Sequence, residues 1–243
     1  MANSFFRFKK FIVHQDKAAM KVCTDACLFG AYVATWLQQR TAQSEAMHLL
    51  DIGTGTGLLS LMLAQKIAAQ TDAVEIDEAA AQQAGDNFIQ SPWSERLKIT
   101  HTGIQEFQPS AKTYDFIISN PPFFENDLRS SRQNRNLALH SEALTLDELL
   151  LHIKRLLTKN GSFALLLPYH RAAYVEKLAA QHHFFTKEKV LVKQTPRHPF
   201  FRAFFIFETI SSTAIVSEIT IRNGHNDYTP EFIQLLKDYY LHL

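Results

Sequence analysis

The sequence contains only two cysteines among its 243 residues, Cys23 and Cys27, four positions apart. Without a second cysteine pair, the disulfide framework that staples small secreted domains is excluded. A structural zinc site needs four ligands, and no compact histidine pair lies near these cysteines. The first ten residues are also too polar for a secretory signal. We therefore expect free thiols in a reduced, cytoplasmic protein without a bound metal.

Long hydrophobic runs and an excess of charge are also missing. No apolar stretch reaches the roughly 20 residues that span a membrane. The 25 Lys and Arg nearly balance the 24 Asp and Glu, which leaves a formal net charge of +1. A globally basic nucleic-acid coat protein is thereby excluded, and any contact with nucleic acid has to come from a local patch.

What is present is enough apolar sequence for a full core. Hydrophobic residues make up 46% of the chain, and no repeat or low-complexity linker divides it. We expect one domain over residues 1–243, in a monomer, with two appendages. These are a basic-aromatic arm over about residues 1–20 and an amphipathic C-terminal helix over about 228–243.

Short apolar runs alternate with helical patterns through the middle of the chain. Apolar residues recur at helical spacing between the runs, and this alternation predicts an α/β fold with a parallel sheet. The final two β-rich runs, joined by a turn with two prolines, predict an antiparallel hairpin at one sheet edge. The predicted strands are 47–52, 73–76, 97–101, 114–119, 162–167, 186–194 and 201–209, and the predicted helices are 58–69, 78–89, 146–157 and 171–182.

A glycine loop, with Gly53, Gly55 and Gly57, directly follows the first of these central strands. Glycines let the backbone turn tightly and approach a ligand closely, and the loop leads into a helix N-terminus. The spacing G-x-G-x-G differs from that of dinucleotide-binding and P-loop motifs. Glu75 and Asp77 end the next strand, where such folds place a carboxylate against ribose hydroxyls. We favour Glu75 over Asp77 for that role.

The tetrapeptide Asn120-Pro121-Pro122-Phe123 follows the fourth strand. Each proline fixes φ and lacks an N–H, so the segment stays extended with free carbonyls. Asn120 adds a side-chain acceptor and Phe123 a flat apolar face, which together suit the amino group of a planar ring. Asn-Pro and Pro-Pro are also common in loops that end strands, so a simple turn is the alternative.

These motifs together resemble the class I S-adenosylmethionine-dependent methyltransferases. The segment 51–57 is similar to that family's cofactor loop, Glu75 to its ribose-binding acid and 120–123 to its amino-methylating motif. The resemblance implies S-adenosylmethionine as cofactor and a Rossmann-like, seven-stranded, mostly parallel sheet with helices on both faces. It implies catalytic roles for Asn120, Pro121, Pro122 and Phe123, and cofactor contacts by Asp51, Gly53, Gly55, Gly57, Glu75, Ile76, Ile104 and Asn120. An acidic contact to the cofactor adenine, common in relatives, is missing near Gly103.

The N-terminal part narrows the resemblance. The segments 8–11, 14–16 and above all 21–30, together with 90–96, resemble the bacterial tRNA1(Val) (adenine-N6)-methyltransferase family. This implies that Lys21, Thr24 and Asp25 line the methionine end of the cofactor pocket. It also implies a tRNA partner, recognised at the adenosine beside the anticodon. Thr24 and Asp25 equally suit the N-terminal cap of a helix, and both interpretations can hold.

Several basic clusters are candidates for RNA contact, each with a plainer explanation. The three arginines in 129–136 suit a loop that grips the RNA backbone, or an ordinary solvated loop. The phenylalanines interleaved with Lys9 and Lys10 suit an RNA-facing patch or, better, core packing. Arg197, His198 and Arg202 are further candidates in the predicted hairpin.

Other functions remain open at this stage. The tetrapeptide equally serves methylation of a ribosomal RNA base, a DNA adenine or a release-factor glutamine. Enzymes that methylate the release-factor glutamine usually carry a separate helical N-terminal domain, for which the residues before the first predicted strand leave little room. A DNA adenine enzyme would be expected to carry a target-recognition domain, and we expect none here. A non-catalytic RNA-binding module on the same scaffold is the alternative outside enzymes.

Overall fold

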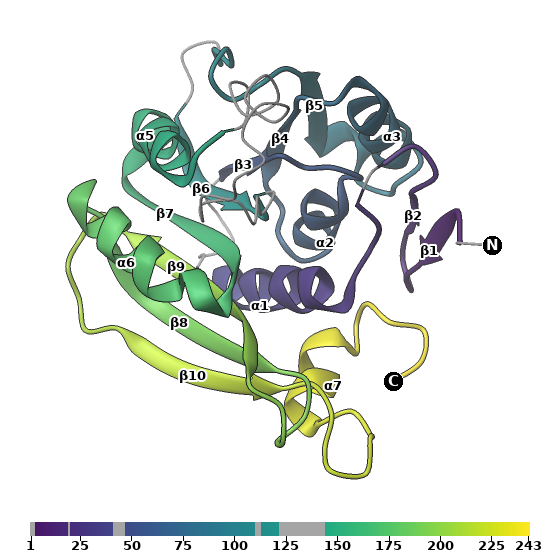
Figure 1. The fold of residues 1–243 in the computed structure, drawn as a ribbon. Helices are drawn as coiled ribbons and strands as arrows, with labels where there is room; N and C mark the ends of the chain where they lie inside the picture. Colours follow the sequence, from purple (N-terminus) through teal and green to yellow (C-terminus); the bar gives the residue numbers. More distant parts are fainter. Residues whose placement is uncertain (1–2, 19, 41–46, 110–112, 122–143) are drawn as a thin grey trace, which may run out of the picture.

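The computed structural model describes residues 3–18, 20–40, 47–109, 113–121 and 144–243. Within them, eight strands form one sheet in the order β10-β8-β9-β7-β6-β3-β4-β5 (Figure 1). Only β9 runs antiparallel to its neighbours. The strands are β3 His48–Ile52, β4 Gln70–Glu75, β5 Leu97–His101, β6 Tyr114–Ser119, β7 Leu157–Pro168, β8 Phe185–Lys193, β9 Phe200–Glu208 and β10 Ile215–Thr220.

The predicted fold class is confirmed, including the parallel centre and the antiparallel hairpin β8-β9. The sheet has one strand more than predicted, because β10 pairs in parallel with β8 at the edge. Four of the six β10 residues are exposed and only Ile219 is buried. A strand that buries so little lacks the apolar run by which the other strands are recognised.

Helices cover both faces of the sheet (Figure 1). Buried side chains of four helices join the core on one face, and those of two helices join the core on the other. The first group is α1 Thr24–Arg40, α2 Leu58–Lys66, α3 Glu78–Ile89 and α7 Pro230–Leu236, and the second is α5 Leu146–Leu156 and α6 Ala172–Gln181. Thr145 begins α5 with a capping box, in which its side chain and that of Glu148 each accept a backbone N–H.

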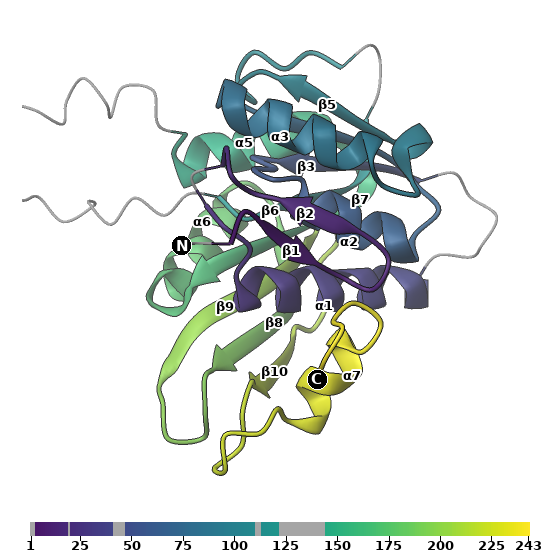
Figure 2. The ribbon, with the colours of Figure 1, turned by 90° about the vertical axis from the view of Figure 1, so that its right-hand side faces the viewer.

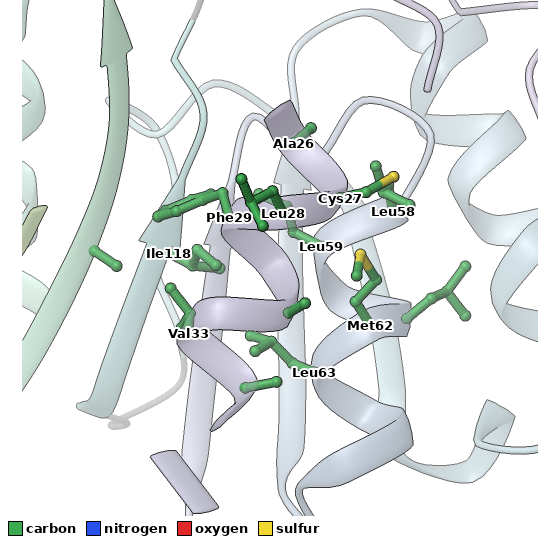
Figure 3. Close-up of a cluster of buried hydrophobic side chains, with 14 of the residues drawn as sticks. Ala26, Cys27, Leu28, Phe29, Val33, Leu58, Leu59, Met62, Leu63 and Ile118 are labelled. Carbon is green, nitrogen blue, oxygen red and sulfur yellow. The ribbon is translucent and has the colours of Figure 1, made fainter. Parts of the chain in front are cut away.

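Close packing between α1 and α2 fixes α1 against the loop that precedes α2 (Figure 3). A Cβ added at Gly30 would lie 2.8 Å from Met62 Sδ, so the Met62 side chain would have to shift. Leu28 and Phe29 on α1 and Met62 on α2 are fully buried. The start of α1 is therefore held beside the glycine loop.

The N-terminal arm and the C-terminal tail pack together. Strands β1 Phe5–Arg7 and β2 Ile12–His14 form a small antiparallel pair beside α3 (Figure 2), and Phe6 and Phe8 contact the ring of Tyr240, which follows α7. Phe8 and Phe11 are 2% and 5% exposed and stack at 4.4 Å, so core packing accounts for these two rings. The tail helix is shorter than predicted, because only Pro230–Leu236 is α-helical.

Across the ranges that the structure describes, no helix combines the length and the apolar character that crossing a membrane requires.

Candidate active site

A cavity of about 400 Å³ opens at the carboxyl ends of β3, β4 and β6. This edge is where α/β sheets of this kind bind ligands. Of the predicted site residues, the cavity wall contains Lys21, Gly53, Gly55, Glu75, Ile76, Ile104 and Asn120. Thr24, Asp25, Asp51 and Gly57 are not part of this wall.

Two carboxylates, Glu75 and Asp77, border the cavity, and they differ in what holds them. Its Oε2 accepts the backbone N–H of Gly55 at 2.8 Å, and its Oε1 accepts that of Asp77 at 3.0 Å. Asp77 instead caps α3, where its Oδ1 accepts the N–H of Ala80 at 2.8 Å. The geometry therefore favours Glu75 over Asp77 as the acid that faces a ligand, with its remaining lone pairs available.

Asp51 holds the glycine loop and the start of α2 through hydrogen bonds to its side chain. Its Oδ2 accepts hydrogen bonds from Thr54 Oγ1 at 2.6 Å, Ser60 Oγ at 2.7 Å and the Ser60 N–H at 3.2 Å. The carboxyl is completely buried, and this desolvation raises its pKa from 3.8 to about 6. Gly57 has a φ of +82°, and a Cβ there would lie 2.5 Å from the Phe88 ring. Both residues shape the loop without bordering the cavity.

Asp25 and Thr24 lie in the first turn of α1. Asp25 is 9% exposed, and its Oδ2 accepts from Arg202 Nε at 2.6 Å. This ion pair anchors the start of α1 to β9. The cavity is bordered instead by Met20, Lys21, Val22 and Cys23, which precede α1, and by Ala26 within it.

Asn120 is the polar group at the rim toward β6. Its side-chain Oδ1 is buried and has no hydrogen-bond partner among the described residues. A buried amide oxygen without a partner is costly, so the position calls for a donor from a ligand. Pro121 is buried beside it. Pro122, Phe123 and the 129–136 arginines lie outside the described residues.

Apolar side chains line the cavity at the end of β4 and beyond β5. Ile76 is 62% exposed although it is apolar, and Ile104 is 3% exposed. Gln105 lies beside them, with its Oε1 2.9 Å from the position of a Cβ on Gly103. Near Gly103, where relatives commonly have an acidic residue, this chain therefore presents a side-chain amide, which can both donate and accept hydrogen bonds.

Two buried amides that the sequence did not indicate dock the arm on this site. Asn87 on α3 accepts the His14 N–H and donates to the carbonyls of His14 and Thr56, each at 2.9 Å. Gln15 Oε1 accepts the Val22 N–H at 2.8 Å. The arm is thereby tied to the glycine loop and to the segment that covers the cavity.

The two cysteines are free, and burial raises the pKa of each thiol to about 12. Both therefore stay protonated near neutral pH and are poor nucleophiles. No group of three or more His, Cys, Asp or Glu side chains in the described ranges is arranged to hold a metal ion.

Comparison with known proteins assigns the chain to a family. Residues 30–193 match the model of the methyltransferase small domain. A Dyadobacter fermentans protein called tRNA1(Val) (adenine(37)-N6)-methyltransferase is 42% identical, with 98% of each chain covered. A Cytophaga hutchinsonii protein of the same name is 38% identical, with all of both chains covered.

Solved structures show the same fold at low sequence identity. A predicted O-methyltransferase from Agrobacterium tumefaciens has a TM-score of 0.64 at 15% identity, over 88% of this chain and 96% of its own. A magnesium protoporphyrin IX methyltransferase from Synechocystis, solved with bound S-adenosylmethionine, has a TM-score of 0.56 at 14% identity, over 76% of this chain and 80% of its own.

Proposed function

The chain belongs to the tRNA1(Val) (adenine(37)-N6)-methyltransferase family, and on that premise we propose that it methylates N6 of the adenosine beside the anticodon of a tRNA. The observation that carries the proposal is the buried, unpartnered Oδ1 of Asn120 at the rim of the cavity. An exocyclic amine is the donor that would satisfy this acceptor.

The residues of the cavity fit S-adenosylmethionine, which supplies an electrophilic methyl group when bound. Glu75 presents a fixed carboxylate for ribose hydroxyls. Ile76 and Ile104 offer apolar surface for an adenine ring, with the Gln105 amide beside them. Open space at Gly55, where an added Cβ would have no neighbour within 4 Å, lets a ligand approach the backbone.

Positioning of the target amine is the main task of the protein. The N6 lone pair of adenine is delocalised into the ring, so the amine is a weak nucleophile. Asn120 Oδ1 and the Pro121 carbonyl would accept the two amine hydrogens and orient the lone pair toward the methyl group. These acceptors gain strength as positive charge develops on the nitrogen, which favours the transition state over the ground state. Phe123 would stack against the base.

The anticodon loop is a suitable place for this chemistry. Its adenosine is already unpaired, so turning it into the pocket costs less than extrusion from a duplex. A monomeric enzyme that acts in the cytoplasm without a metal, as a single domain over residues 1–243, completes the proposal.

The test is a methyl-transfer assay with a labelled cofactor. Total tRNA, ribosomal RNA, release factor and DNA are supplied in parallel, and the modified material is digested for nucleoside and peptide analysis. We expect N6-methyladenosine in tRNA alone, within the anticodon loop of a valine acceptor. Label in the release factor or in ribosomal RNA would assign another substrate. Cofactor binding without transfer to any substrate would leave a non-catalytic module.

A further inference from the structure

An exposed pair of aromatic rings lies outside the cavity, at the same edge of the sheet. The rings of Tyr169 and Phe200 are 5.3 Å apart between centroids and tilted by 48°. Tyr169 is 41% exposed and Phe200 is half-buried. Lys193 Nζ lies 5.1 Å from the centroid of the Phe200 ring, as in a cation–π contact.

Strand register relates these rings to Asn120. Ser119, the last residue of β6, is opposite Leu165 of β7, and Tyr169 follows the end of β7 four residues later. Tyr169 therefore continues the strand next to the one that leads into Asn120. Phe200 begins β9, where Arg202 is opposite Pro168 and pairs with Asp25 of α1.

The turn between β8 and β9 projects on the side of the molecule where α1 begins (Figure 2). The start of α1 in turn contributes Ala26 to the cavity wall. The rings and the cavity thus share one side of the protein.

The two segments that carry the rings contain charges of one sign only. Segments 168–173 and 193–202 contain Arg171, Lys193, Arg197 and Arg202 but no Asp or Glu. Glu218 pairs with Lys193 at 3.0 Å and Asp25 pairs with Arg202, whereas Arg197 is exposed at the hairpin turn. Exposed aromatic rings bordered by cations are the combination by which proteins hold single-stranded nucleic acid.

We propose that Tyr169 and Phe200 form an aromatic platform on which unpaired bases of the anticodon loop stack, while Lys193 and Arg197 contact the adjoining phosphates. This rests on the proposed function, because it places further nucleotides of the same RNA beside the Asn120 site. The platform binds bases through their faces, so it holds the loop without selecting its sequence. The identity of the methylated base remains with the Asn120 pocket.

The experiment measures binding of an anticodon stem–loop RNA by fluorescence anisotropy. Losing a stacking ring weakens binding by roughly 5- to 150-fold in comparable proteins, and we expect Tyr169→Ala to fall in that range. Tyr169→Phe keeps the ring and should bind like the wild type. Tyr174→Ala is the matched control, since this ring is 48% exposed and lies 4.9 Å from Arg171 Cζ, but belongs to α6 on the opposite face from α1.

A spectroscopic signature separates stacking from a general loss of structure. 2-Aminopurine is placed in turn at each loop position around the target, and stacking quenches its fluorescence. We expect at least one position to be quenched by the wild type and by Phe200→Tyr, but not by Tyr169→Ala or Phe200→Leu. Arg197→Ala should make the slope of the logarithm of the binding constant against the logarithm of salt concentration shallower by roughly one.

The outcomes distinguish the two proposals. If the wild type methylates tRNA and Tyr169→Ala binds the stem–loop as tightly as Tyr174→Ala, the platform is wrong and the proposed function stands. Quenching that persists in both ring-removal variants overturns the platform as well. If the wild type neither binds nor methylates any tRNA, the proposed function fails and the platform fails with it.

Discussion

Asp25 at the start of α1 and Arg202 on β9 are joined by an ion pair of 2.6 Å between Oδ2 and Nε. The two residues are 177 positions apart in the chain, and their side chains are only 12% and 29% exposed. The pair holds the helix that borders the cofactor cavity against the hairpin strand. It gives Asp25 a structural role in the place where the family resemblance suggested a ligand contact.

Asp25→Ala should therefore lower the free energy of unfolding by about 2–3 kcal/mol, because the Arg202 guanidinium loses its hydrogen-bonded carboxylate in a partly buried place. Urea denaturation measures the change. The double variant Asp25→Ala with Arg202→Met should be less destabilised than the sum of the single changes. Titration calorimetry with S-adenosylhomocysteine tests whether Asp25 also contacts the cofactor. A large loss of affinity in a folded Asp25→Ala variant would make Asp25 a ligand contact.

Asn120→Ala should reduce the rate of methyl transfer by about 10²-fold or more, the size of the loss when one hydrogen-bonding group aimed at developing charge is removed. Cofactor affinity should stay close to that of the wild type. Asn120→Asp retains an acceptor oxygen and should keep more activity than the alanine variant. Undiminished turnover of Asn120→Ala in single-turnover kinetics would remove the amine clamp from the mechanism.

Asp51 predicts a specific dependence of stability on pH. Its pKa is raised by burial from 3.8 to about 6, so the folded state holds a proton that the unfolded state has released between these values. This group therefore contributes most stability below about pH 4, and the contribution is lost as pH rises through about 6.

Asp51→Asn should remove this contribution to the pH dependence of the unfolding free energy, which amounts to at most about 1.4 kcal/mol per pH unit. The difference between wild-type and variant unfolding free energies, measured at several pH values from 4 to 7, isolates it from the other carboxyls. A constant difference across the series would show that Asp51 ionises normally in the folded protein.

Gln105 should contribute to binding of the cofactor adenine. Gln105→Ala is expected to weaken S-adenosylhomocysteine binding by about 2- to 12-fold, the equivalent of one net hydrogen bond. Because a side-chain amide can rotate to exchange its donor and acceptor, the wild type should also accept the hypoxanthine analogue. Gln105→Glu only accepts and should reject that analogue.

Gln108 provides the control for Gln105. It lies nearby but lines a separate polar pocket with Asp72 and Lys98, so Gln108→Ala should leave cofactor binding unchanged. Equal effects of the two alanine variants would place Gln105 outside the adenine site.

The sequence predicted those parts of the molecule that rest on local pattern. Apolar alternation predicted the parallel sheet, and the DIGTGTG motif followed by Glu75 predicted residues that meet at one cavity. Both depend on neighbours in sequence or on the shared edge of parallel strands.

The parts it did not predict depend on partners far apart in the chain. Nothing near Asn87 indicates that its amide bonds to His14, 73 residues away. The sequence also does not reveal that Arg202 is the partner of Asp25. A ligand contact and an ion pair of Asp25 could therefore not be told apart. Strand β10 was missed for a different reason, since it buries almost none of its side chains.

The contact between Lys9 and Tyr239 has a consequence for synthesis of the chain. The Lys9 N–H donates to the Tyr239 carbonyl at 2.8 Å, and the Tyr239 hydroxyl, on a buried ring, donates to the Met62 carbonyl at 3.0 Å. On the ribosome the arm emerges more than 200 residues before this partner, so the Lys9 contact forms only after Tyr239 has been synthesised. Since the arm leads into the segment that lines the cofactor cavity, we expect a nascent chain to complete its binding site only after residue 239 has emerged.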